Sequence, residues 1–284
     1  QDYADYVASA CDGNAGVLAP GLPNMIAMTP GTSGRPSLVP HMEDVSRTFF
    51  FRGVCVAFAV LESGFPGAVD ELQRSANLAF RAAKRELPSG LEVGSNSSSP
   101  DDHGFQRFLC AYTSPLAAYH LSREPEAIYA HALLALKDHN LGIIEANFAP
   151  IVCLLLDAAR DNRRSLVQDL RNGHIWDRRL AEDAPDRELR DAIDAALDGP
   201  DPKRAFDVDR LLKERAPASR IWPNLRVVMT TDGGVFAPAA ARLREMLGDG
   251  VEIYAPIYAA TEGLLGVNVM PQRPFGVSTY LLDP

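Results

Sequence analysis

The stretch LRVVMTTDGGVFAPAAARLREMLGDGVEIYAPIY, residues 225–258, decides the expected fold. Its apolar runs predict one strand over Leu225–Met229 and a second over Val251–Tyr258. Between them, Ala237–Leu247 has the apolar spacing of a helix, and Gly248 marks its end. Two strands joined through a helix lie parallel in one sheet, with a right-handed crossover. The stretch therefore predicts a parallel sheet with a helix packed on it.

A second strand-like region lies near the other end of the chain. Asn24–Met28 is apolar, breaks into a loop rich in Gly, Thr and Ser, and resumes as Ser37–Val39. This pattern predicts a strand, a tight loop and a strand. From about residue 44 to 90, apolar spacings near three and four predict two helices, which Pro66 and Gly67 divide.

The middle of the chain is expected to be mostly helical. Glu126–Leu136 and Ile151–Ala159 have helical apolar spacing, and the second is apolar on nearly every side, which predicts a buried helix. The charged stretch Arg160–Arg215 predicts a helical layer with one face in solvent. Leu91–His103 is polar and small, which predicts a surface loop, and the glycosylation sequon at 96–98 has little weight without a secretion signal. The alternation of short β-like runs with longer helical ones predicts the α/β class.

Composition narrows the possible partners. The chain has 284 residues, with 28 Lys and Arg against 37 Asp and Glu and a formal net charge of −9. An acidic chain without a basic cluster lacks the electrostatic footprint of phosphate-backbone binding, so no nucleic acid is expected as the main partner. The longest apolar run, Phe49–Leu61, contains Arg52 and is shorter than the about 20 residues that cross a bilayer, so no membrane partner is expected.

Cysteine usage indicates the compartment. Cys11, Cys55, Cys110 and Cys153 lie far apart, with neither CxxC spacing nor the density of a secreted disulfide scaffold. They are expected to be free, mostly buried thiols in a reducing compartment, which favours a cytoplasmic location. The chain opens with Gln1 rather than Met and shows no signal-peptide pattern, which indicates a fragment or a processed piece.

One candidate site is the loop TPGTSGR at residues 29–35. Its glycines let the backbone approach a ligand, and its three hydroxyls and its N–H groups are suited to phosphate oxygens. The loop lacks the Gly-Lys-Ser or Gly-Lys-Thr ending of a Walker A motif. Taken alone, the loop favours an ordinary β-hairpin turn over a phosphate site.

A second candidate site is expected where the C-terminal strands end. The first strand leads into the stretch TTDGG at 230–234, and the second leads into YAATEG at 258–263. Ligands of open α/β sheets bind outside the carboxyl ends of the strands, so the Gly-Gly loop and the Thr-Glu pair are expected to line one crevice. A carboxylate beside bound phosphates is a natural Mg²⁺ ligand, which makes Glu262 the expected metal-binding residue.

These motifs, in this order, resemble those of the adenylate-forming superfamily. Within it, the sequence is most similar to the plant auxin and jasmonate acyl acid amido synthetase family and its animal and microbial relatives. The resemblance is carried by MTPGTSGRP at 28–36 and YAATEGLLGVN at 258–268, with intervening blocks at 112–115, 127–129 and 222–225. It spans most of the chain.

The resemblance implies the large N-terminal domain of such an enzyme, with a parallel-rich sheet flanked by helices. Residues 1–284 would form that domain incompletely, without the mobile C-terminal domain of the family. The implied activity is that of an ATP-dependent acid–amino acid ligase. A small carboxylic acid attacks the α-phosphate of ATP to give an acyl-adenylate and pyrophosphate, and the amine of an amino acid then displaces AMP to form an amide.

The resemblance also implies roles for individual residues. Thr261 would contact the α-phosphate and Glu262 would help to hold Mg²⁺, and these two are the expected catalytic residues. The first loop would hold the β- and γ-phosphates, and the Gly-Gly loop would border the nucleotide and the acyl group. The expected ATP-binding residues are Thr29, Gly31, Thr32, Ser33, Gly34, Gly233, Gly234, Tyr258, Ala259 and Ala260.

Three positions depart from the family pattern. Pro30 stands where the family usually has Ser, which removes a hydroxyl and an N–H donor; Ser37 stands where Lys is common, and Ala260 replaces a frequent Ser. These departures leave open a catalytically degenerate member of the family that acts as a binding or interaction domain. An acyl-CoA ligase is a further alternative, because thioester and amide formation share the first half-reaction.

Overall fold

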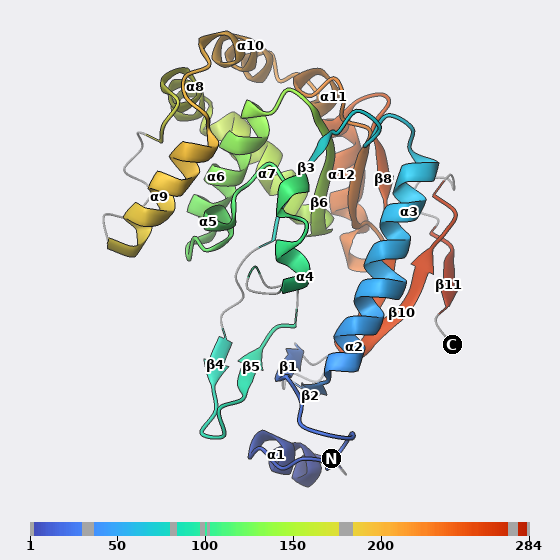
Figure 1. The fold of residues 1–284 in the computed structure, drawn as a ribbon. Coiled ribbons are helices and arrows are strands. Elements are labelled where there is room, and N and C mark those ends of the chain that lie inside the picture. The colour runs from blue at the N-terminus through green and yellow to red at the C-terminus, as the bar shows by residue number, and fades with distance from the viewer. Residues whose placement is uncertain are drawn as a thin grey trace.

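The fold was analysed in a computed structural model, which describes residues 3–29, 37–79, 84–96, 100, 103–175, 184–271 and 278–282. A four-stranded parallel sheet occupies its centre (Figure 1). The strand order is β3-β6-β7-β8, so each strand lies beside the next one of this sheet along the chain. The strands are β3 (Arg74–Asn77), β6 (Leu141–Phe148), β7 (Val227–Thr231) and β8 (Glu252–Tyr254).

Helices cover both faces of this sheet. The larger apolar core lies between one face and α6 (Glu124–Lys137), α7 (Ala149–Asp161) and α12 (Ala237–Leu247). A further helical layer lies outside these helices, at the top of Figure 1. It consists of α8 (Arg163–Asn172), α9 (Ala184–Ala196), α10 (Pro202–Lys213) and α11 (Ala218–Ile221).

The opposite face of the central sheet packs on α3 (Cys55–Gly64). Leu61 of this helix and the following Phe65 are buried in one cluster with Ile143 and Val227 of the sheet. The helix continues backwards through a π-helical turn, η1 (Phe49–Val54), into α2 (Glu43–Thr48). With helices on both faces of a parallel sheet, the predicted α/β class is confirmed.

A second, three-stranded antiparallel sheet runs alongside this long helix. Its order is β11-β10-β9, with β9 (Ile257–Ala260), β10 (Gly263–Asn268) and β11 (Tyr280–Leu282). Close approach of helix and sheet depends on Gly53 of η1, because a Cβ atom there would lie 3.3 Å from Leu264 Cδ1.

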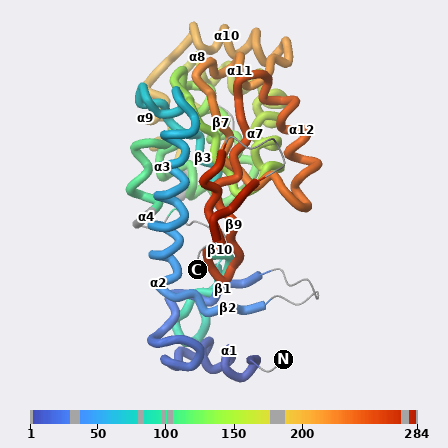
Figure 2. The backbone as a smooth tube through the Cα atoms, turned by 90° about the vertical axis from the view of Figure 1, so that its right-hand side faces the viewer, coloured from blue at the N-terminus to red at the C-terminus, as the bar shows by residue number. Residues whose placement is uncertain are grey.

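The third sheet forms the lower lobe of the molecule together with α1 (Ala4–Cys11) (Figures 1 and 2). Its order is β2-β1-β5-β4, with β1 antiparallel to β2 and parallel to β5. The strands are β1 (Met25–Thr29), β2 (Ser37–His41), β4 (Lys84–Glu86) and β5 (Glu92–Gly94). Short helical segments complete the described elements: α4 (His103–Gln106), η2 (Leu109–Ala111), α5 (Leu116–Tyr119) and η3 (Gly234–Phe236).

Several sequence predictions are confirmed. The strand–helix–strand unit is present as β7, α12 and β8 in parallel register, and Gly248 ends the helix with a φ of 80°. The N-terminal strand, loop and strand are present as the antiparallel pair β1 and β2. The helices α6 and α7 lie where apolar spacing placed them, and the charged stretch that follows is helical in its described parts.

The prediction that strands lie only near the two ends of the chain is wrong. The central strand β6 lies between two helices, at residues 141–148, and Leu141–Glu145 is buried without interruption. A strand of a parallel sheet that is covered on both faces loses the alternation of polar and apolar residues by which strands are recognised. Without that alternation, the sequence pattern did not identify β6 as a strand.

The second helix expected before residue 90 is also absent from the described residues. Leu72 has a φ of 58° and is 88% exposed, so it neither continues a helix nor anchors one. Strand β3 follows it, with Ser75 and Ala76 both buried, and β4 lies further on. Residues 80–83 lie outside the described part of the chain.

Three smaller predictions need correction. The surface loop expected over Leu91–His103 contains β5, where Val93 is only 3% exposed. The strand expected over Val251–Tyr258 is broken at Pro256, which has no N–H, and its carbonyl oxygen accepts from the Asn268 N–H instead. All four cysteines are free, but only Cys153 is buried. Among the described helices, none is long and apolar enough to cross a membrane.

The start of β6 generates a prediction about stability. A Cβ atom on Gly142 would lie 2.1 Å from the carbonyl oxygen of Ala68 and 2.5 Å from Gln73 Cβ, so Gly142→Ala forces a main-chain segment off the sheet. We expect urea denaturation to show a loss of about 2–3 kcal/mol, in the range typical of overpacked cores. Gly233→Ala is the control, because that glycine has an extended backbone and nothing within 4 Å of an added Cβ. Equal stability of the two variants would contradict the prediction.

Candidate functional site

The Thr-Glu pair of the second motif lies in the tight turn between β9 and β10. Thr261 is half-buried and Glu262 is exposed. The turn packs against the long helix, because a Cβ atom on Gly263 would lie 3.5 Å from Val45 Cγ1 of α2. The turn therefore does not follow the parallel sheet directly, as expected, but belongs to an antiparallel hairpin that extends beyond the end of β8.

A hydrogen bond joins this turn to the lower lobe. Asn96 Nδ2 donates to the carbonyl oxygen of Thr261 at 3.1 Å. Asn96 follows β5, whose Gly94 pairs with Ala27 of β1 in parallel register. Asn96 comes two residues after Gly94, and Thr29, where the phosphate-loop motif begins, comes two residues after Ala27. The end of β1 and the Thr261 turn thus lie on the same side of the lower lobe.

Of the first motif, the structure describes Thr29. Thr29 is the last residue of β1 and is half-buried. Gly31, Thr32, Ser33 and Gly34 lie outside the described residues. The structure therefore fixes where the predicted phosphate loop leaves the sheet, at the carboxyl end of β1.

The Gly-Gly loop follows β7, and Asp232 at its start lies near Tyr280 of the antiparallel sheet. Gly233 is exposed, while the preceding Asp232 is buried, and burial raises the pKa of its carboxyl group. Burial also raises the pKa of Tyr280 in β11, and the nearby charge of Asp232 raises it further. The ring of Tyr280 lies 5.6 Å from that of Tyr258 in β9. Asp232, Tyr280 and Tyr258 thus form a row that connects the Gly-Gly loop to the second motif.

Exposed apolar groups border this loop. Phe148, at the end of β6, stacks on Phe236 with ring centroids 4.5 Å apart. Val235 beside them is 86% exposed. In β9, Tyr258, Ala259 and Ala260 are exposed as well. The carboxyl edge of the central sheet therefore offers an apolar, partly aromatic surface next to flexible glycine backbone.

A buried polar cluster, absent from the sequence predictions, lies on β3 and β6. Glu145 Oε2 accepts from Asn77 Nδ2 at 3.2 Å, and burial raises the pKa of this carboxyl group while hydrogen bonding from Ser75 and Asn77 opposes the rise. Burial, and then the charge of Glu145, raises the pKa of Tyr112 and Tyr119. The one available signal was an acidic residue within an otherwise apolar run.

The described residues hold no group of three or more His, Cys, Asp or Glu side chains that could bind a metal ion unaided. Glu262 offers one exposed carboxylate on a turn. A single carboxylate suits Mg²⁺, which keeps several waters and takes its other oxygen ligands from substrate phosphates. The donor set therefore fits a metal that arrives with a nucleotide.

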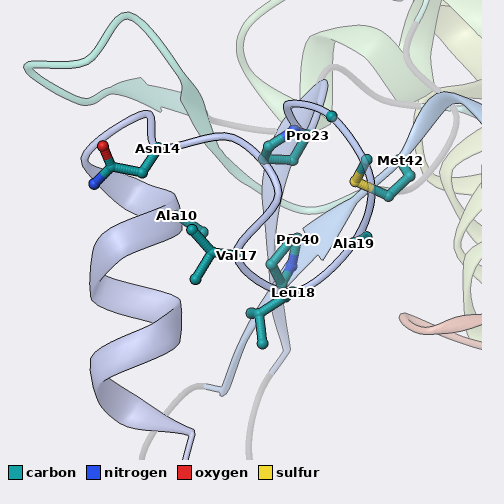
Figure 3. A pocket seen from close by; sticks show the side chains of 9 residues that line it. Ala10, Asn14, Val17, Leu18, Ala19, Pro23, Pro40 and Met42 are labelled. Carbon is teal, nitrogen blue, oxygen red and sulfur yellow. The ribbon is translucent and has the colours of Figure 1, made fainter.

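A hollow in the lower lobe lies apart from these residues, between α1 and the end of β2 (Figure 3). Its lining is apolar except for the Asn14 amide: Ala10, Asn14, Val17, Leu18, Ala19, Gly21, Pro23, Pro40 and Met42. With no titratable side chain in its lining, it is suited to packing rather than to chemistry.

The fold and these loops define an α/β ligand-binding domain with its candidate site at strand carboxyl ends. The sequence model of the GH3 family N-terminal domain matches residues 1–253, and the chain belongs to the GH3 family. The resemblance to acyl acid amido synthetases is thereby confirmed at the level of the family.

Individual relatives cover parts of the chain. A mouse GH3 domain-containing protein is 41% identical over 105 residues, which are 36% of this chain and 19% of that protein. Jasmonoyl–L-amino acid synthetase GH3.3 of Oryza sativa subsp. japonica is 29% identical over 164 residues, 56% of this chain and 34% of that protein. The solved structure of AtGH3.15 acyl acid amido synthetase in complex with 2,4-DB has a TM-score of 0.83 at 20% identity and covers 99% of this chain and 49% of that chain. This chain thus spans less than half the length of each.

The buried histidine of α6 generates a prediction about pH. His131 Nδ1 lies 2.8 Å from Ser114 Oγ, and burial lowers the pKa of this histidine from 6.5 to about 4. At pH values between these two pKa values, the histidine is protonated in the unfolded chain but neutral in the folded protein. The free energy of unfolding therefore falls as pH decreases. From pH 7 to pH 5 we expect this residue to account for a loss of about 2 kcal/mol.

The measurement is urea denaturation of the wild-type protein and His131→Gln at both pH values. The stability difference between the two proteins should shrink by that amount on acidification. A difference that stays constant would show that the proton affinity of His131 does not change on folding.

Proposed function

We propose that this chain is the ATP-binding N-terminal part of an acid–amino acid ligase. Its substrates would be a small carboxylic acid, an amino acid and Mg²⁺-ATP. Membership of the GH3 family supports this proposal, as do the names of the rice synthetase and of AtGH3.15. The observation that supports it is the hydrogen bond from Asn96 to Thr261, which joins the Thr-Glu turn to a segment next to the sheet that the Ser/Thr/Gly loop leaves.

The chemical demand of the first step is charge neutralisation around a transferring adenylyl group. The carboxylate of the acid attacks the α-phosphate, and pyrophosphate leaves in line with it. In our proposal the Thr261 hydroxyl would donate to an α-phosphate oxygen, and the Glu262 carboxylate would hold Mg²⁺, which would supply positive charge against the phosphates. The loop after Thr29, through Gly31, Thr32, Ser33 and Gly34, would bind the β- and γ-phosphates.

The second step forms the amide. The amine of the amino acid attacks the acyl carbon, and AMP leaves with the phosphate oxygen. Gly233 and Gly234 would border both the nucleotide and the acyl group, with Tyr258, Ala259 and Ala260 along the adjoining strand. The apolar surface of Phe148 and Phe236 beside this loop favours an acid with an apolar body.

We further propose a cytoplasmic protein with small-molecule substrates, and residues 1–284 as one incomplete adenylate-forming domain. The free state of all four cysteines supports a reducing compartment. The domain assignment rests on the family match over residues 1–253 and on the coverage of less than half of each relative.

One alternative from a different class has a specific observation behind it. Pro30 and Ala260 lack hydroxyls that the family usually supplies, and Ser37, at the exposed start of β2, lacks the charge of the usual Lys. A degenerate member that binds without catalysing would show no acid-dependent pyrophosphate release in the full-length protein. An acyl-CoA ligase would release pyrophosphate but yield a thioester with CoA, and product mass distinguishes this outcome.

The assigned metal ligand provides the test of nucleotide binding. We expect Glu262→Gln to weaken Mg²⁺-ATP binding by about tenfold, or about 1.4 kcal/mol, because the amide keeps the shape but loses the charge that holds the cation. Isothermal titration calorimetry on this chain measures the affinity. Glu245→Gln, an exposed position near the end of α12, makes the same charge change away from the carboxyl edge and should leave the affinity unchanged. Equal affinities of both variants would remove Glu262 from the site.

A further inference from the structure

We propose that Asn96 is a positioning residue that fixes the Thr261–Glu262 turn for nucleotide binding. This inference rests on the proposed function of that turn and adds a residue that neither candidate motif contains. Asn96 and Thr261 are 165 residues apart in sequence and belong to segments next to different sheets. Their hydrogen bond therefore ties the lower lobe to the antiparallel sheet.

The hydrogen bond acts on a turn that also contacts the long helix. Gly53 lets Leu264 of β10 approach η1, and Gly263 lies against Val45 of α2. These van der Waals contacts locate the hairpin against the helix, but dispersion contacts have little directionality. A hydrogen bond does have a preferred direction, so the Asn96 amide sets the orientation of the turn as well as its position.

The orientation matters for a specific atom. In a planar trans peptide, the carbonyl oxygen of Thr261 and the N–H of Glu262 point in opposite directions. Holding the carbonyl oxygen on Asn96 therefore turns the Glu262 N–H away from the lobe segment that carries Asn96. The hydrogen bond thereby orients the peptide plane between Thr261 and Glu262, from which both side chains extend.

The register of β1 and β5 makes Asn96 suited to this role. Gly94 pairs with Ala27, and the chain reaches Asn96 two residues after Gly94 and Thr29 two residues after Ala27. Asn96 thus links the group expected to contact the α-phosphate to the sheet whose strand β1 ends at Thr29.

The test compares two asparagines whose side-chain amides each donate to a main-chain carbonyl oxygen, one at the Thr261 turn and one far from it. Asn96→Asp keeps the size of the side chain and replaces its N–H donor with an oxygen that repels the Thr261 carbonyl. Asn140→Asp is the matched control, because Asn140 Nδ2 also donates to a main-chain carbonyl, that of Glu71, at 3.0 Å and at the amino end of β6. Both variants are measured in this chain by amide hydrogen exchange, thermal denaturation and Mg²⁺-ATP calorimetry.

We expect Asn96→Asp, but not Asn140→Asp, to speed amide exchange over residues 259–263 and to weaken Mg²⁺-ATP binding about fivefold, which corresponds to one hydrogen bond of about 1 kcal/mol. Both variants should lower the melting temperature by similar small amounts. This split between local and global effects separates positioning from a merely structural contribution.

The outcomes separate this inference from the proposed function. If the amide exchange rate over residues 259–263 is unchanged in Asn96→Asp, Asn96 does not hold the turn, whatever the Mg²⁺-ATP affinity. Faster exchange with unchanged Mg²⁺-ATP affinity overturns its role in nucleotide binding. If the wild-type chain fails to bind Mg²⁺-ATP, the proposed nucleotide site fails and the role of Asn96 in it falls too, while the exchange result still decides whether Asn96 holds the turn.

Discussion

The pairing of β6 with β3 on one side and β7 on the other organises the whole molecule. Ile143 pairs with Ser75 and Val227, so segments about 150 residues apart are aligned through one residue of this strand. The strand enters the sheet at Gly142, whose carbonyl oxygen accepts from the Arg226 N–H while the Ala68 carbonyl passes over its bare Cα. Beyond this point Ile143 packs towards α3 and Ile144 towards α6 and α7, so both cores depend on the same register.

Parallel pairing also determines where chemistry can occur. The carboxyl ends of the four strands meet at one edge, where the half-buried Asn77 donates to the buried Glu145 and Phe148 stacks on Phe236. The chain then leaves β8 at Ala255–Pro256 and forms the hairpin of β9 and β10 rather than another parallel strand. This departure brings the Thr261 turn to the lower lobe, so the proposed site would draw its residues from three sheets instead of one.

Sequence patterns predicted what local rules determine and missed what long-range burial determines. The α12 helix ends at a glycine with positive φ, and β1 and β2 flank a turn-rich loop, so both were predicted correctly. Strand β6 was missed because burial on both faces removes periodicity, and β5 because a three-residue strand between polar loops has none. The sequence did not indicate that Asn96 contacts Thr261, because a hydrogen bond between residues 165 positions apart has no local sequence pattern.

The three acidic residues Asp232, Glu145 and Glu262 differ in how well burial or exposure suits them to bind a metal ion. Asp232 and Glu145 are 7% and 8% exposed, and burial raises the pKa of both, so each favours its neutral form more than a carboxyl group in water does. A metal ligand must instead be ionised at neutral pH without a large desolvation cost. Glu262 is exposed on its turn, so its carboxylate stays hydrated until a cation replaces the water. In a chain of net charge −9, the triphosphate of the proposed function would add further negative charge, and a divalent cation at Glu262 would offset part of that repulsion. Asp232 suits this role less well, because burial raises the pKa of its carboxyl group and so disfavours the ionised form that a metal needs.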